Sequence, residues 1–151
     1  MALKLSTGLR NQLCDTAPLK TILALGRLNI YKTSGGVPDT ADDALVGGTH
    51  TLLCSISNNN TGTGLTLAAA AAAGVITKNL SETWSHAAAA SGDAAFFRFV
   101  AVGDTGALST TEPRLQGLCA LAGGELNLPA LAMVATTVYT VDDWSFALPT
   151  L

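Results

Sequence analysis

The clearest alternation of side chains in the sequence lies at residues 94–102, which include three of the four phenylalanines. In an extended chain Phe97 and Phe99 would share one face, while Arg98 would lie on the other among apolar neighbours. A strand that is mainly apolar on both faces belongs in the interior of a sheet covered on both sides. Residues 103–106, Gly-Asp-Thr-Gly, then supply turn chemistry. The pattern therefore predicts a central strand that ends at this turn.

Shorter alternating stretches predict further strands, separated by Gly-rich and polar turns. A polar tip at 58–64 predicts a hairpin between the strand at 49–57 and a strand at 65–67. About eight short strands with such turns indicate an all-β domain, an antiparallel β-sandwich of jelly-roll-like form. The expected strands lie at 27–32, 49–57, 65–67, 94–102, 115–121, 125–129 and 134–148, the last with a bulge at Asp142 and Asp143. The small-residue segments on either side of Trp84 suggest two more strands.

The start of the chain has a different period. Leu5, Leu9 and Leu13 recur every four positions, which predicts a helix, and Ser6 or Thr7 can cap its first turn. We expect this helix to bury its leucine stripe against a partner surface, because a short apolar helix is not stable alone.

Residues 15–18 break this helix, with Pro18 at the first position of a second one. The second helix covers 19–25 and ends at Gly26. We therefore expect an N-terminal helical arm at 1–26 and a β-sandwich domain at 27–151. The arm either covers its own domain as a lid or reaches a neighbouring subunit, and the sequence leaves both open.

Six consecutive alanines at Ala68–Ala73 have strong helix propensity. We nevertheless expect strand and loop there. A glycine-rich turn precedes the run, β-branched residues follow it, and six residues are too few to hold an isolated helix.

The composition changes this picture by suggesting a covered surface. Of 151 residues, 48% are hydrophobic and only 13% are charged, whereas ordinary soluble domains have about 25% charged residues. So few charges suit a protein that packs against neighbours. The net charge is −3 and the eight Lys and Arg residues are scattered, which argues against nucleic-acid binding.

No membrane span or export signal is expected. The longest apolar run, at 65–76, falls short of about 18 residues and contains a glycine. The first residues lack a basic stretch followed by an apolar one, so we expect synthesis in a cytoplasm.

Candidate metal and thiol chemistry is sparse, and we expect no cofactor. The three cysteines, at positions 14, 54 and 119, have no paired spacing, which predicts free thiols, and only two histidines are available for a zinc site. Asp42 and Asp43 lie in an acidic loop. Turn capping explains them better than calcium, because Ca²⁺ needs six or more oxygen ligands.

The sequence does not predict an enzyme. Asp104-Thr105-Gly106 is the triplet of aspartic proteases, but the flanking residues supply no equivalent of their flap, and a turn in which Asp104 bonds its own backbone is favoured. Neither His50 nor His86 lies beside a nucleophile elbow.

Arg98 and Arg114 are the two informative charges. A guanidinium inside an apolar strand needs a partner, and we expect Arg98 to bind a carboxylate from Asp104, from Glu82 or from another chain. A salt bridge within the chain and a contact between subunits both remain open.

Several motifs along the chain are informative when taken together. They are Leu3-Lys4-Leu5-Ser6-Thr7-Gly8-Leu9-Arg10-Asn11, Leu28-x-Ile30-Tyr31 with Pro38 and Ala41-Asp42 after it, Glu82-Thr83-Trp84, Phe97-Arg98-Phe99, Gly103-Asp104-Thr105-Gly106, Ser109-Thr110-Thr111-x-Pro113-Arg114 and Leu126-Asn127-Leu128. With these motifs the chain resembles a family of small proteins of tailed bacteriophages and prophages. The resemblance runs over most of the chain and includes no catalytic motif.

The resemblance implies a virion structural protein, with a capsid cement or decoration protein as the first expectation. Such a protein would form a dimer or trimer on the capsid surface and bridge capsomers of the major capsid protein. A tail, adaptor or fibre-base component is the alternative, and a host-surface glycan-binding or glycan-hydrolysing module is the alternative of another class. The expected interface residues are Leu5, Leu9, Leu13, Leu19 and Ile22, with Arg98 and Arg114 as polar anchors.

Overall fold

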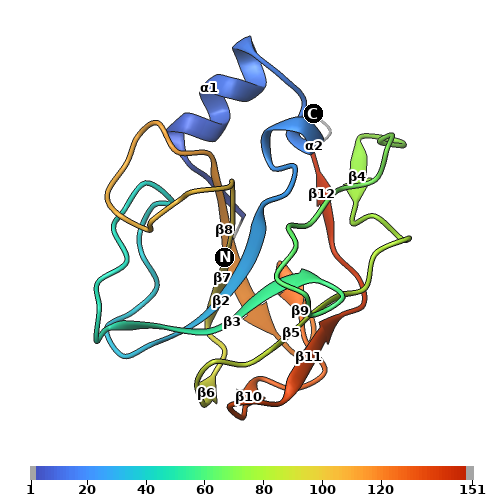
Figure 1. The fold of residues 1–151 in the computed structure, drawn as a ribbon. Helices are drawn as coiled ribbons and strands as arrows, with labels where there is room; N and C mark the ends of the chain where they lie inside the picture. Colours follow the sequence, from blue (N-terminus) through green and yellow to red (C-terminus); the bar gives the residue numbers. More distant parts are fainter. Residues whose placement is uncertain (1–2, 149–151) are drawn as a thin grey trace.

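The computed structural model describes residues 3–148, which fold into a predominantly β domain (Figure 1). The two helices are α1 (Thr7–Asp15) and α2 (Leu19–Ile22). The strands are β1 (Lys4–Leu5), β2 (Arg27–Thr33), β3 (His50–Asn58), β4 (Val75–Thr77), β5 (Trp84–Ala87), β6 (Gly92–Asp93), β7 (Phe96–Val100), β8 (Arg114–Ala120), β9 (Leu126–Asn127), β10 (Ala132–Met133), β11 (Val138–Val141) and β12 (Ser145–Ala147).

One large sheet organises the domain. It has eight strands in the order β1-β8-β7-β2-β3-β5-β11, with β9 also paired to β8. All pairs in it are antiparallel except β8 with β9. Two ribbons, β10 with β6 and β12 with β4, complete the fold. The predicted all-β antiparallel class is confirmed, whereas the jelly-roll arrangement stays a prediction.

The predicted central strand is confirmed as β7. It lies between β2 and β8, and all five of its residues are buried. The register sets Arg98 between Asn29 and Gln116, and Phe99 between Leu28 and Leu115. Because side chains alternate along each strand, this register divides the sheet into one apolar face and one polar face.

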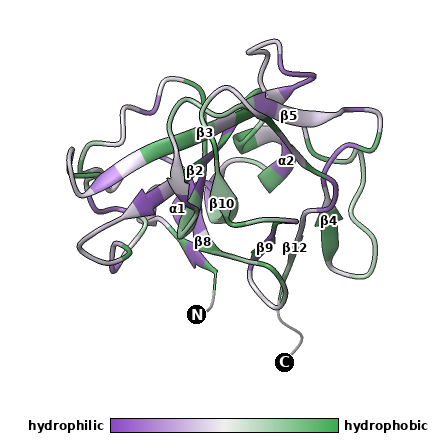
Figure 2. Ribbon diagram, turned by 90° about the horizontal axis from the view of Figure 1, so that it is seen from below, coloured by the Kyte–Doolittle hydropathy of each residue, from purple (hydrophilic) through white to green (hydrophobic). Residues whose placement is uncertain are grey.

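The apolar face holds the main core. Its centre is an aromatic cluster in which the rings of Trp84 and Phe99 lie 5.7 Å apart, those of Phe99 and Trp144 5.5 Å, and those of Trp84 and Trp144 6.0 Å. These edge-to-face and tilted geometries are the favourable ones for aromatic pairs. Figure 2 shows β4 and β10, outside the large sheet, as hydrophobic in character. The sheet residues of this face are Leu28, Ile30, Cys54, Ile56, Phe97, Phe99 and Leu115, all fully buried.

The polar face is covered by a loop layer, which we define as residues 34–49 and 101–113. The first segment connects β2 to β3 and the second connects β7 to β8, and they lie side by side in Figure 1. Backbone hydrogen bonds join them, from Leu45 N to Gly106 O at 2.8 Å and from Ser109 N to Asp42 O at 3.0 Å. The long polar connection expected after the central strand is therefore a structural cover.

The N-terminal residues pack against the rest of the domain, and the division of the chain at residue 26 stays a prediction. Leu5 lies in β1, paired to β8, and so begins the fold as a strand instead of a helix. Ser6 caps α1 as predicted, accepting a hydrogen bond from Leu9 N. A Cβ on Gly8 would lie 2.2 Å from Thr111 O, so the helix packs directly on the loop layer.

The second helix is shorter than expected. Pro18 takes its N-cap position, and α2 ends at Ile22. Leu25 has φ +60°, outside the helical region, and its N–H donates to Leu65 O at 2.8 Å. Pairing with the segment around Leu65 therefore stops the helix three residues early.

Two strand predictions are wrong in detail. Residues 65–67 make only isolated bridges, from Leu65 to Gly26 and from Leu67 to Lys78, and form no hairpin strand with β3. The expected long strand at 134–148 divides into β11 and β12, which pair with β5 and β4 in different sheets. Thr136, at φ +70°, interrupts extended backbone before β11. Ala68–Ala73 contains no helix, as expected.

Candidate functional site

The polar face of the sheet holds a group of buried charged side chains, Arg98, Arg114 and Asp104. Arg114 on β8 makes a bidentate pair with Asp104, with Nε to Oδ2 at 2.6 Å and Nη2 to Oδ1 at 2.8 Å. The side chains of both are 1% exposed. Arg114 also donates to the carbonyl oxygen of Ala107 at 2.7 Å, and its other contacts reach the carbonyls of Ala41 and Asp42. Such a fork-shaped pair is the strong form of an ion pair.

Arg98, on the neighbouring strand, has no carboxylate partner within residues 3–148. Its guanidinium donates to Gln116 Oε1 at 2.7 Å, to Asp43 O at 2.8 Å and to Thr40 O at 3.3 Å. Burial, together with the nearby charge of Arg114, lowers the pKa of Arg98 to about 10. The expected contact of Arg98 with Asp104 or Glu82 is therefore wrong, because Arg114 binds Asp104 and neutral oxygens accept from Arg98.

These contacts show that the network fixes the loop layer onto the sheet. Asp104 also accepts from Gly106 N at 2.8 Å, which is the predicted turn. Gln116 extends the network to Pro38 O at 2.8 Å. Arg98 and Arg114 are 0% and 1% exposed. Neither side chain is accessible to another protein in this structure, so their expected use as interface anchors is corrected to an internal structural role.

The acidic loop residues also have structural roles. Asp42 accepts from Thr7 N at 2.8 Å and from Thr7 Oγ1 at 2.7 Å, so it caps the first turn of α1 from the loop layer. Asp43 accepts from Thr40 N at 2.7 Å. Asp43 therefore caps a turn, as predicted, whereas Asp42 caps a helix. Among the residues the structure describes, no three His, Cys, Asp or Glu side chains are grouped to hold a metal ion.

Within residues 3–148, one hydrogen bond joins a serine side chain to a histidine side chain, between Ser57 Oγ and His86 Nδ1 at 3.0 Å. Ser57 is fully buried, and its Oγ also accepts from Gly62 N at 3.1 Å. A buried hydroxyl cannot reach a substrate carbonyl. The pair therefore stabilises the turn after β3 and has no geometry for nucleophilic catalysis.

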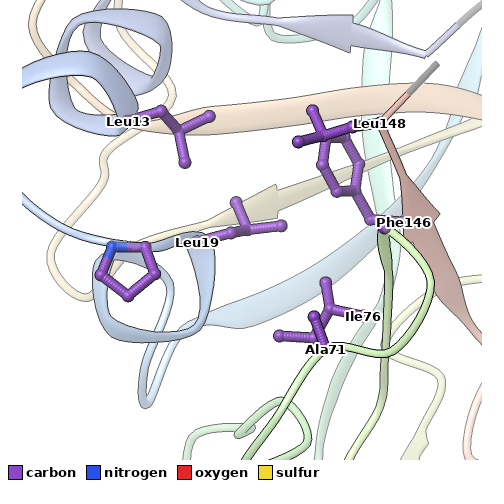
Figure 3. A pocket seen from close by; sticks show the side chains of 8 residues that line it. Leu13, Leu19, Ala71, Ile76, Phe146 and Leu148 are labelled. Carbon is purple, nitrogen blue, oxygen red and sulfur yellow. The ribbon is translucent and has the colours of Figure 1, made fainter. Parts of the chain in front are cut away.

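An apolar surface pocket of about 310 Å³ lies beside the helices (Figure 3). It lies between the helical segment and the β4–β12 ribbon. Figure 3 shows Leu13 and Leu19 from the helices facing Phe146 and Leu148 from the last strand region. No charged side chain lines it, so it is suited to an aliphatic group. The lining residues are Leu13, Pro18, Leu19, Ala71, Gly74, Ile76, Phe146 and Leu148.

The structure separates the five leucine and isoleucine residues expected at an interface. Leu13 and Leu19 meet in the apolar pocket, as described. Leu9 is fully buried in the core, so it is not available to a partner, and Leu5 and Ile22 are half-buried against the same core. Two of the five expected interface residues, Leu13 and Leu19, therefore line a surface pocket.

Sequence reasoning missed Gln116, Phe146 and Ile76. Gln116 had a signal, since the spacing Arg114-x-Gln116 puts two polar side chains on one face of a strand. The pocket walls Phe146 and Ile76 had none, because only the pairing of β12 with β4 brings them together.

No family model, no curated protein and no solved structure matches the chain. The resemblance to phage proteins therefore remains a prediction from the sequence. Over residues 3–148, no helix is long and apolar enough to cross a membrane; the longer, α1, has nine residues.

Proposed function

We propose that this chain is a structural protein of a tailed-phage virion, a capsid cement protein that binds the outside of the shell. The observation that carries the proposal is the apolar pocket of Figure 3, which opens at the surface and has no charged residue in its lining. A pocket of this kind suits an aliphatic side chain of the major capsid protein, since anchor residues in apolar pockets dominate protein interfaces.

The loop layer supports the same function. Val46, Val102 and Leu108 are 56%, 70% and 70% exposed on its outer side. Isolated exposed aliphatic residues are common, but these three lie on two hydrogen-bonded segments and belong to a surface with few charges. Contacts of this kind are weak singly and hold through the number of copies on a shell.

The aromatic residues argue against the glycan-binding alternative. Sugar rings stack on exposed aromatic faces, but the four phenylalanines, both tryptophans and Tyr31 are buried. Tyr139 is half-buried, and its hydroxyl accepts from Val134 N at 2.8 Å. The described residues thus offer no aromatic platform for a sugar.

Cosedimentation with undecorated, expanded capsid shells tests the proposal. The wild-type chain should saturate the shells at many copies per particle. Leu148→Glu places a charge at the pocket, where Leu148 is 62% exposed, and should weaken binding by about tenfold or more. Leu121→Glu is the matched control, since Leu121 is 64% exposed outside this pocket, and it should bind normally.

Absence of any complex with shells would overturn the proposal. If the two glutamate variants bind the shells equally well, the apolar pocket is not the site of shell binding. A stained gel of purified virions separates the alternatives, because a shell protein is present in many copies, whereas a tail, adaptor or fibre-base protein forms a single small ring.

A further inference from the structure

The two edges of the large sheet differ in whether the outer side of the edge strand is paired or covered. At one edge β8 is paired outward twice, by β1 near its start and by β9 near its end. Lys4 on β1 donates to Asp39 O at 2.7 Å and to Pro38 O at 3.2 Å, which ties that edge to the loop layer. At the other edge lies β11, at the lower right of Figure 1, and no strand of the described residues pairs with its outer side.

The register shows which backbone groups of β11 are free. Ser85 O on β5 accepts from Asn60 N, and Ala87 N donates to Asn60 Oδ1, so these two β5 residues direct their backbone groups away from β11. Their partners on β11 are Thr140 and Val138. In an antiparallel pair the hydrogen-bonded positions alternate. The N–H and C=O groups of Val138 and Thr140 therefore point outward from the sheet.

This edge lacks the features that usually prevent pairing. Its sequence, Val-Tyr-Thr-Val, consists of residues with high strand propensity and contains no charge or proline. Val138 is 51% exposed. Natural sheets block such edges with lysine, proline or a covering segment, which is what the β1 edge has.

We propose that β11 pairs antiparallel with β11 of a second copy of this chain, across a two-fold axis at Tyr139. Val138 of each copy then lies opposite Thr140 of the other, and the outward N–H and C=O groups of both residues are satisfied. The pairing is compatible with charge, because the nearest carboxylate, on Asp142, falls opposite Thr136 of the other copy. A single sheet runs through the dimer.

This inference is independent of the capsid role, because the pocket tested by shell binding is formed by other residues. It specifies which contact holds the expected oligomer, and a two-fold edge pairing gives a dimer and excludes a trimer through this surface. A four-residue strand makes a small interface, so the dimer should dissociate at about micromolar to millimolar concentration.

Sedimentation equilibrium over that concentration range, with three variants, tests the proposal. Val138→Pro removes an N–H that the monomer does not use, and should weaken dimerisation by about tenfold or more. Val138→Lys adds a charge to the edge and should act in the same direction. Leu108→Lys is the matched control: Leu108 is 70% exposed in the loop layer between β7 and β8, away from β11, and the dimer should persist.

Amide hydrogen exchange gives a readout that a general loss of stability would not mimic. Tyr139 and Val141 face β5 and should be protected at every concentration. Val138 and Thr140 should gain protection only as dimer forms. A monomer at millimolar concentration, a trimer, or a dimer that Val138→Pro leaves intact would overturn the proposal. A monomer that loses shell binding in Val138→Pro would assign the edge to another protein's strand and overturn pairing with a second copy.

Discussion

The two faces of the large sheet are stabilised in opposite ways, although they share the same strands. On one face Phe99 packs against two tryptophan rings and Phe97 lies in the same core, and stability comes from the apolar area removed from water. On the other, Arg98 and Arg114 are equally buried but make directed hydrogen bonds to loop carbonyls. The comparison shows that a sheet can place its apolar core on one side and use the other to hold irregular segments in one conformation.

Arg114→Met is the substitution expected to destabilise the contacts of the polar face most. It leaves the carboxylate of Asp104 buried without its partner, which should lower the free energy of unfolding by about 3–5 kcal/mol. Urea denaturation measures the loss, and limited proteolysis should show cleavage within 101–113. Arg10→Met, at an exposed position on α1, should change neither.

Arg98→Met should cost less, about 1–3 kcal/mol by the same denaturation experiment. It removes hydrogen bonds to Gln116, Asp43 and Thr40, but it also removes a buried cation that Arg114 repels. A larger loss than that of Arg114→Met would contradict the division of roles in which Arg114 neutralises a buried charge and Arg98 does not.

Alkaline pH should destabilise the apolar face through its buried thiols. Burial raises the pKa of Cys54 to about 11 and that of Cys119 to about 12, with Glu125 adding to the second shift. Because the folded-state pKa values are raised, the stabilisation is complete below the unfolded value near 9 and is lost as pH rises toward 11 and 12. At pH 10 each thiol should account for a loss on the order of 1 kcal/mol.

Thermal or urea unfolding at pH 8 and pH 10 measures the loss of stability expected from titration of the buried thiols. Cys54→Ala should show a smaller decrease between the two pH values than the wild type. Cys14→Ala, which changes an exposed cysteine on α1, should show the same decrease as the wild type. An unchanged pH dependence in Cys54→Ala would show that this thiol does not titrate during unfolding.

Local patterns predicted the elements that depend on neighbouring residues. The central strand, the Ser6 cap and the Asp104 turn each follow from a few adjacent side chains, and the structure has all three. Elements that depend on distant partners were not predictable. The pairing of Leu5 with Leu115 and the choice of Asp104 by Arg114 instead of Arg98 are set by packing of segments far apart in sequence.

The candidate site follows the same rule. Leu13 and Leu19 were identifiable from a helical stripe, but the opposite wall of their pocket was not, since it needs β12 beside β4. The unpaired edge at β11 could not be predicted from the sequence for a related reason. Alternation through 134–148 suggested one long strand, and only the register with β5 shows which of its backbone groups remain free.

The Ser6 hydroxyl has a consequence for how the chain reaches its native state during synthesis. It accepts from Arg114 N at 2.9 Å and donates to Glu112 O at 2.8 Å, contacts that span 108 and 106 residues of sequence. Closing so long a loop is slow compared with local contacts. The first helix therefore leaves the ribosome long before its docking surface exists, and the domain can close only after most of the chain has been translated.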